Sequence, residues 1–313
     1  MHALITGGLG FIGSHLAARF CRDGHRVSLI VRNPDSIPAV DVTGAVIVPL
    51  DLLNEEASGK LSLGPIDCLV HLAGPSSAME RLDDPAGILA DGRRGTLNAL
   101  ALAERFNASR FLYASSLAVY GEPACNPVSE TAPCLPLSQY AIGKLANEHL
   151  VESFCRDSGI RFNHLRLAAV YGPGQDLSRT THGIVNIFLG MLMKGSAVTS
   201  KGSLDRFRDL IHIDDAVEAC LRCAKVEISD GPLNIGSGES ITVERLINVL
   251  ADEVGIADSL AVDIAEGTPG DVNGITADIS KMQALLSFNP QYSPDDGVRR
   301  YVRWVIENGS QEQ

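Results

Sequence analysis

A tyrosine and a lysine stand four residues apart, at Tyr140 and Lys144, on a segment with helical periodicity. Side chains four residues apart lie on one face of a helix, so the ammonium group would lie close to the phenol. A nearby positive charge favours the phenolate and lowers the pKa of a tyrosine from its ordinary value of about 10. The pair therefore predicts a phenol that acts as a general acid or base.

Two serines, Ser115 and Ser116, end an expected strand just before that helix. Ligands of parallel α/β sheets bind at the carboxyl ends of the strands. A hydroxyl at this edge would be placed to polarise an oxygen atom of a substrate. The serines matter to the argument, because a Tyr-x-x-x-Lys spacing alone is common on helices and indicates only an amphipathic surface pair.

A glycine-rich turn, Gly8-x-Gly10-x-x-Gly13, joins the first expected strand (residues 2–6) to the first expected helix. Glycine permits positive φ, lets the backbone approach a pyrophosphate and allows the helix to lie close to the sheet. The helix N-terminus offers N–H groups and the positive end of the helix dipole to phosphates. We expect a dinucleotide here, in contact with Gly7, Gly8, Gly10, Phe11, Ile12 and Gly13.

The type of dinucleotide depends on the end of the second strand, about 20 residues further on. An acidic residue there would bind the adenosine ribose, but the sequence reads Val31-Arg32-Asn33. Because Arg32 can pair with a 2′-phosphate, the sequence favours NADP over NAD; Arg32 stacked on adenine or facing solvent is the alternative. Asp51 either accepts a hydrogen bond from the adenine amino group or is a loop or helix-capping residue.

Alternating strands and helices surround these residues. Apolar runs predict strands at residues 26–31, 45–48, 67–72, 110–115 and 161–170, and helical patterns stand at 85–106 and 138–158. This alternation predicts a doubly wound parallel sheet. After residue 172 the rhythm becomes irregular, with helices expected near 184–194, 214–224, 243–254, 279–286 and 295–307 and short strands near 209–212 and 231–234.

The expected architecture is therefore an α/β fold in two parts. A dinucleotide-binding domain spans residues 1–172, and residues 209–236 return to it. A smaller, mainly helical C-terminal lobe, formed by residues 173–208 and 237–308, would bind the substrate.

Composition excludes several classes of protein. The 313 residues carry a formal charge of −12 without a basic cluster, so we expect no nucleic acid partner. No apolar run approaches the roughly 20 residues of a membrane span, and no signal peptide precedes the first strand, so we expect a cytoplasmic protein without membrane contact. The seven cysteines are scattered, which favours reduced thiols. Cys220 and Cys223 form a single pair on a helix and predict buried thiols rather than a metal site.

Several ordered motifs make the sequence similar to the extended short-chain dehydrogenase/reductases, in particular the NAD(P)-dependent epimerase/dehydratase family, which acts mostly on nucleotide sugars. The motifs are Thr6 to Gly13, His71-Leu-Ala-Gly74, Gly95-Thr96-x-Asn98, Ser115-Ser-Leu-Ala-Val-Tyr-Gly121, Tyr140 to Lys144, Leu165 to Pro173, Arg208 to Asp215, Asn234 to Gly238 and Pro269-Gly-Asp271.

This resemblance implies a Rossmann fold and a role for each matching residue. Tyr140 would transfer the proton, Lys144 would bind the ribose of the cofactor, and Ser116, five residues before Gly121, would hold the substrate oxygen. It further implies a homodimer in which the helices at 85–106 and 138–158 pair with their symmetry mates. The expected contacts also include Leu52, Leu72 and Ala73 for the cofactor and Arg208 for a substrate phosphate.

Departures from the family pattern narrow the chemistry. Leu117-Ala118 replaces the acidic pair of the sugar dehydratases, so dehydration is not expected. Ala169 and Thr268 stand where an Asn and an Arg of the substrate lobe are usual, so two anchors for a sugar diphosphate are missing.

We therefore predict NAD(P)-dependent hydride transfer at a sugar carbon of a nucleotide-activated sugar, with a 4-keto-sugar reductase as the main interpretation. The alternative is a nucleotide-sugar 4-epimerase that retains NAD. Ala169 and Thr268 keep open a carbonyl or hydroxysteroid-type dehydrogenase with a non-nucleotide substrate. A catalytically silent dinucleotide sensor is a further alternative, against which the intact Ser116, Tyr140 and Lys144 argue.

Overall fold

The computed structural model describes residues 1–54, 61–76, 83–179, 181, 183–227, 230–267 and 272–309. Thr268 and the Pro269-Gly-Asp271 motif lie outside these residues. Within the described part of the chain, no helix has the length and the apolar character that crossing a membrane requires.

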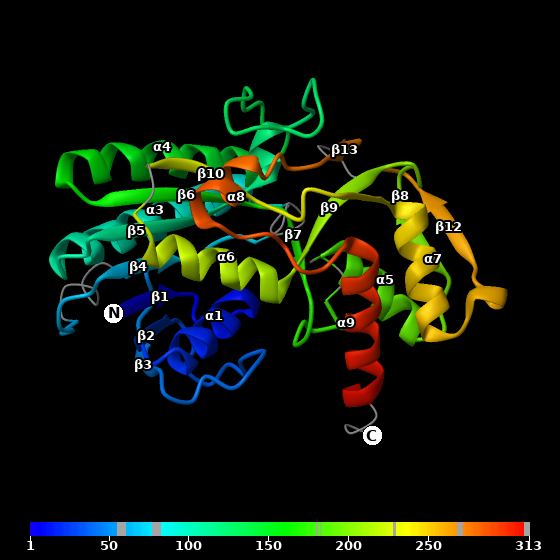
Figure 1. Cartoon of the computed structure of the whole chain (residues 1–313), viewed down its shortest axis with the longest axis horizontal. Coiled ribbons are helices and arrows are strands. Elements are labelled where there is room, and N and C mark those ends of the chain that lie inside the picture. Colours follow the sequence, from blue (N-terminus) through cyan, green and yellow to red (C-terminus); the bar gives the residue numbers. More distant parts are fainter. Residues whose placement is uncertain are drawn as a thin grey trace.

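Seven parallel strands form the central sheet, in the order β10-β6-β5-β4-β1-β2-β3 (Figure 1). The chain runs from β1 outward to β3, and then returns to β4 on the other side of β1. The prediction of a doubly wound parallel sheet is therefore confirmed. The strands are β1 (His2–Thr6), β2 (Arg26–Val31), β3 (Val46–Pro49), β4 (Cys68–His71), β5 (Arg110–Ser116), β6 (Arg161–Leu167) and β10 (Gly231–Ile235).

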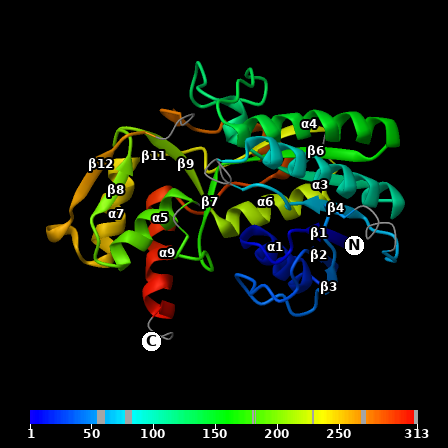
Figure 2. The ribbon, with the colours of Figure 1, turned by 180° about the vertical axis from the view of Figure 1, so that it is seen from behind.

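Helices cover both faces of this sheet (Figures 1 and 2). α1 (Phe11–Arg22) and α6 (Ile213–Lys225) lie on one face, and α3 (Pro85–Arg105) and α4 (Gln139–Ser158) lie on the other. Alternate residues of β1 serve the two layers, because Ile5 joins the core under α1 and α6 while Leu4 joins the core under α3 and α4. Burial on both faces explains why these strands are continuous apolar runs.

A second cluster of elements lies beside the sheet, at the right of Figure 1. It contains three helices, α5 (Ile184–Met193), α7 (Val243–Val254) and α9 (Pro294–Gly309), which share an apolar core with Tyr171. It also contains two small sheets that the sequence did not predict. One joins β7 (Ala169–Tyr171), β9 (Phe207–His212), β11 (Ser240–Thr242) and β13 (Gly274–Ile275), and the other pairs β8 (Val198–Lys201) with β12 (Val262–Ala265).

The strand expected at residues 161–170 is two strands, so this prediction is wrong. β6 ends at Leu167 in the central sheet, and β7 begins at Ala169 and pairs with β9 instead. The backbone N–H of Ala168 donates to the carbonyl oxygen of Ile235 (2.8 Å), which marks the point where the chain leaves the central sheet. A continuous apolar run does not show such a change of partner.

α8 (Ser280–Leu286), which we expected in the smaller lobe, packs against β10 and α6 beside the central sheet. The expected strand at 209–212 pairs with β7 and β11 rather than with the central sheet. The division of the chain into two lobes stays a prediction.

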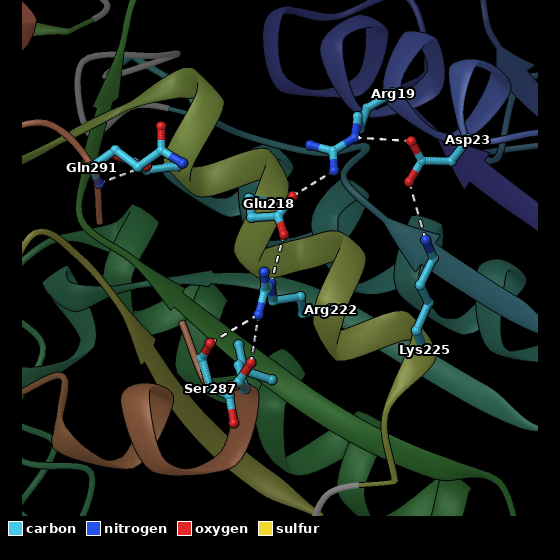
Figure 3. Close-up of polar contacts among 9 residues, drawn as sticks. Arg19, Asp23, Glu218, Arg222, Lys225, Ser287 and Gln291 are labelled. Atoms are coloured by element: carbon cyan, nitrogen blue, oxygen red, sulfur yellow. Dashed lines mark hydrogen bonds and ion pairs between the residues drawn. The ribbon is translucent and has the colours of Figure 1, made fainter. Parts of the chain in front are cut away.

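A line of charged side chains fixes α1 to α6 and α6 to α8 (Figure 3). Arg19 of α1 pairs with Glu218 of α6 (Nη2–Oε2 2.7 Å), and Glu218 also accepts from Arg222 (2.6 Å). Arg222 in turn donates to the carbonyl oxygen of Ser287, just after α8 (2.9 Å). These partly exposed pairs contribute modestly, because water screens them.

Two glycines with positive φ differ in the space around them: Gly121 follows η1 (Leu117–Tyr120), and Gly159 follows α4. Gly121 has φ 66°, and a Cβ there would collide with the carbonyl oxygen of Leu135, whereas Gly159 has φ 70° with no atom within 4 Å of an added Cβ. We expect Gly159→Ala to lower the free energy of unfolding by about 1 kcal/mol. Gly121→Ala should cost about 3 kcal/mol or more, because collision adds to backbone strain. Urea unfolding of both variants measures this, and equal losses would contradict the expected collision.

Candidate functional site

A cleft opens between the segment that follows β4, the helix α3 and the first half of α4. It brings together three of the predicted site residues, Ala73, Tyr140 and Lys144. The lining is Ala73, Gly74, Pro75, Ile88, Leu89, Gly92, Thr96, Tyr113, Gln139, Tyr140, Gly143, Lys144 and Asn147.

Lys144 lies between the strand β5 and the phenol ring of Tyr140. Its Nζ donates to the carbonyl oxygen of Ala114 (2.7 Å) and lies 5.6 Å from the centroid of the Tyr140 ring. It also lies 5.4 Å from the centroid of the Tyr113 ring. α4 begins at Gln139, and the side chain of Ser138 caps it by accepting from the N–H of Ala141 (3.2 Å). The helix start thus places the tyrosine in its first turn and the lysine one turn further on, beside the end of β5.

The two serines at the end of β5 have different surroundings. Ser115 is buried, and its Oγ donates to Glu148 Oε1 (2.5 Å). Ser116 is half-buried, and its Oγ caps η1 by accepting from the N–H of Ala118 (3.2 Å). Ser116 does not line the cleft that holds Tyr140. Its role toward a substrate oxygen stays a prediction.

A buried ion pair that the sequence analysis missed joins α4 to β6. Arg166 donates to both carboxylate oxygens of Glu148 (Nε–Oε1 3.0 Å, Nη2–Oε2 2.7 Å), and both side chains are at most 6% exposed. Arg166 also donates to the hydroxyl of Tyr120 (2.9 Å), which donates to Asn234 Oδ1 (2.7 Å). The signal in the sequence is a charged residue in an apolar strand, Leu165-Arg166-Leu167. Such a residue needs a partner, because an unpaired buried charge is costly.

The glycine-rich turn has the shape of a cradle that side chains would fill. Gly7 has φ 68°, and a Cβ on Gly13 would collide with the carbonyl oxygen of Gly7. A Cβ on Gly8 would lie 2.7 Å from Leu29 Cβ. Gly10 is the N-cap of α1, and no side chain in the described residues caps this end. The turn therefore leaves backbone N–H groups of the helix N-terminus for an anion, and it fits the pyrophosphate of a dinucleotide.

The remaining predicted cofactor residues lie along the carboxyl edges of β2, β3 and β4. Arg32 is exposed directly after β2. Asp51 Oδ1 accepts from the N–H of Leu53 (2.9 Å). This contact agrees with the alternative that Asp51 is a loop-capping residue. Leu52 is buried, and Leu72 and Ala73 are half-buried next to the glycine-rich turn. Their contacts with a cofactor stay predictions.

Arg208 lies on β9 and is not part of the cleft lining. Its Nη1 donates to the carbonyl oxygens of Phe207 (2.7 Å) and Asn273 (3.3 Å). The next residue, Asp209, is buried and accepts from the backbone N–H groups of Ser237 (2.8 Å) and Ala277 (3.1 Å). Burial raises the pKa of the Asp209 carboxyl, although these hydrogen bonds act against it. The sequence analysis assigned no role to Asp209, although this residue lies in the motif from Arg208 to Asp215.

The described residues hold no cluster of His, Cys, Asp or Glu side chains suited to a metal ion. Cys220 and Cys223 are free, fully buried thiols in α6. Burial raises the pKa of Cys220 to about 12 and that of Cys223 as well, so both are protonated and unreactive at neutral pH.

Comparison with known proteins identifies relatives over almost the whole chain. Residues 3–236 match the model of the NAD dependent epimerase/dehydratase family. A putative UDP-glucose 4-epimerase of Methanocaldococcus jannaschii is 28% identical over 97% of this chain and 98% of its own length. A Thermotoga maritima UDP-glucose 4-epimerase structure with UDP-glucose is 28% identical, with a TM-score of 0.91 over 98% of this chain and 99% of that one. A Thermus thermophilus UDP-glucose 4-epimerase structure in complex with NAD is 27% identical, with a TM-score of 0.89 over 98% and 100% of the two chains.

The ion pair between Glu148 and Arg166 leads to a prediction about stability. Glu148→Gln leaves the Arg166 guanidinium buried without a counter-charge, so we expect the free energy of unfolding to fall by about 3–5 kcal/mol in urea titrations. A double variant, Glu148→Leu with Arg166→Met, removes both charges and serves as the control. It should lose less than Glu148→Gln alone; a double variant that is less stable than the single one would count against an uncompensated charge as the cause.

Proposed function

This chain belongs to the NAD dependent epimerase/dehydratase family, and from that premise we propose that it is a 4-epimerase of nucleotide sugars that retains NAD. The chain is thus an NAD(P)-dependent enzyme of the extended short-chain type. The single observation that carries the proposal is the approach of the Lys144 ammonium to the Tyr140 ring, in a cleft at the carboxyl edge of the sheet. The relatives that are UDP-glucose 4-epimerases support this alternative more strongly than the keto-sugar reductase that we took as the main interpretation.

The residues of the site support both halves of an epimerisation. NAD, when bound, supplies the acceptor and later the donor of a hydride. Tyr140, as phenolate, removes the proton of the 4-hydroxyl, and the nearby Lys144 ammonium favours that phenolate. Ser116 donates a hydrogen bond to the same oxygen. After the keto sugar turns its other face to the cofactor, Tyr140 returns the proton. Net oxidation is zero.

We propose NAD rather than NADP as the cofactor. A retained dinucleotide is what an epimerase needs, and the related Thermus thermophilus structure contains NAD. The observation that favours the reductase is Arg32, which is exposed directly after β2 and is followed in the sequence by Asn33 rather than by a carboxylate. If Arg32 bound a 2′-phosphate, the cofactor would be NADP, which a reductase exchanges at each turnover.

We propose a UDP-sugar as the substrate, since the related structure from Thermotoga maritima holds UDP-glucose.

We also keep the homodimer as a proposal. Leu97 of α3 and Ile142 of α4 are each 40% exposed, and both lie on the helices expected to pair with a second copy. The cytoplasmic location stays a prediction.

Removing the phenol hydroxyl tests the proposed acid–base residue. We expect Tyr140→Phe to lower the rate of UDP-glucose and UDP-galactose interconversion by about 10²–10⁴-fold, because the phenol is the group that we propose as the general acid and base. A coupled assay of the two sugars measures the rate. Tyr301→Phe is the control, since it also removes a phenol hydroxyl, here a buried one that donates to Asn186 in the second cluster of elements (3.0 Å). Full activity in Tyr140→Phe would refute the assignment.

The retained nucleotide tests the cofactor and the class of reaction. We expect freshly purified protein, when denatured, to release stoichiometric NAD, identified by chromatography and mass. Arg32→Ala should release the same amount, because an epimerase with NAD has no 2′-phosphate for this arginine to bind. NADP that is present in the wild type and lost in Arg32→Ala would instead support the reductase.

A further inference from the structure

His71, at the end of β4, is a buried imidazole with a hydroxyl on each ring nitrogen. Its Nδ1 lies 2.7 Å from Thr6 Oγ1, at the end of β1, and its Nε2 lies 3.2 Å from Thr96 Oγ1, on α3. His71 is 1% exposed, and Thr6 and Thr96 are buried with it. The imidazole thus connects two adjacent strands of the sheet to the helix that covers them.

The neighbouring contacts determine the direction of every hydrogen bond in this group. Thr96 Oγ1 donates to the carbonyl oxygen of Gly92 (2.9 Å), which uses the only proton of that hydroxyl. Thr96 therefore accepts from His71, so the proton of the ring is on Nε2. Nδ1 must then accept from the hydroxyl of Thr6. The N–H of Ala73 completes the chain by donating to Thr6 Oγ1 (3.1 Å).

A neutral ring satisfies all of these contacts. A second ring proton would leave the Thr6 hydroxyl without an acceptor inside the chain of bonds. Burial, and next the Lys144 ammonium, lower the pKa of His71 to about 3, so the ring remains uncharged at neutral pH. Of these two side chains, Lys144 is therefore the one that places a positive charge near Tyr140.

The chain of bonds begins and ends in the wall of the cleft. Ala73, Thr96 and Gly92 all line the cleft with Tyr140 and Lys144. Ala73 also lies against the glycine-rich turn, because a Cβ on Gly7 would be 3.0 Å from the backbone N of Ala73. A shift of Ala73 would therefore be transmitted both to the turn and to the cleft.

We propose that His71 is a positioning residue, a neutral imidazole protonated on Nε2, which acts through Thr6 and Thr96 to hold the Ala73 segment between the glycine-rich turn and the Tyr140 cleft. His71 itself does not line the cleft. The proposal rests on the proposed NAD site. It assigns a task to the first residue of the His71-Leu-Ala-Gly74 motif.

The test removes one hydroxyl at the start of the chain of bonds. Thr6→Val leaves the Ala73 N–H and His71 Nδ1 unpaired, and we expect NAD to dissociate about tenfold faster. Thr6→Ser restores the hydroxyl and should restore the wild-type rate. NAD dissociation is followed by loss of bound nucleotide after dilution, without any turnover assay.

Ser28→Ala provides a matched control. Ser28 Oγ lies 2.9 Å from His2 Nε2, so the same kind of buried hydroxyl–imidazole contact joins β1 and β2. This contact lies at the beginning of β1, away from the carboxyl edge. Ser28→Ala should lower the melting temperature to a similar extent as Thr6→Val and leave the dissociation of NAD unchanged.

The outcomes separate this proposal from the proposed function. A wild-type protein that binds no NAD would refute the proposed function. If the wild-type protein binds NAD, but Thr6→Val releases it at the wild-type rate or Ser28→Ala releases it as fast as Thr6→Val, only the positioning role is overturned.

¹⁵N NMR of the imidazoles in the nucleotide-free protein provides an independent readout. It should show His71 neutral and protonated on Nε2 between about pH 5 and 8, and a ring protonated on Nδ1 would overturn the proposal.

Discussion

The pair of Glu148 and Arg166 is the interaction on which the arrangement of the site depends. Two charges removed from water are tolerated only when they are paired and their remaining donors and acceptors are used. Here the carboxylate takes two bonds from the guanidinium and one from Ser115, and the guanidinium also reaches Tyr120. The ions thus fix α4 to β5, β6 and η1 at one point. A helix held only by apolar contacts could slide, but charges with this geometry have one arrangement.

That constraint explains how a tyrosine and a lysine on a helix come to lie at the edge of the sheet. Glu148 is one helical turn beyond Lys144 and two beyond Tyr140. Pairing Glu148 with β6 therefore sets the rotation of α4 as well as its height. The Lys144 ammonium then meets the carbonyl oxygen of Ala114 on the neighbouring strand. The face of α4 that carries Tyr140 and Lys144 is therefore oriented by a residue that takes no part in the proposed chemistry.

The sequence was sufficient where local patterns decide the structure. Apolar runs, glycines and caps predict the strands and helices of the central sheet. The turn from Gly7 to Gly13 can be recognised in the sequence because its close contacts require glycine. It was insufficient where a residue depends on a distant partner. β13 has two residues, too few for any periodicity, and β7 is distinguished from β6 only by its pairing with β9. His71 reads as a motif residue, and its role depends on the hydroxyls of Thr6 and Thr96. Ser116 matched a pattern and also caps η1, and its role toward a substrate oxygen stays a prediction.

The glycine-rich turn has a consequence for redesign of this protein. Gly7, Gly8 and Gly13 each lie against other atoms so closely that any larger residue would displace them. Main-chain atoms would therefore bind the phosphates of the dinucleotide, and a side-chain substitution cannot remove such a contact. The freedom to evolve or engineer a different cofactor preference lies elsewhere, at the exposed end of β2, where Arg32 can be exchanged without disturbing the packed turn. In the proposed complex, main-chain atoms would bind the part that such cofactors share, and a replaceable side chain would contact the part that distinguishes them.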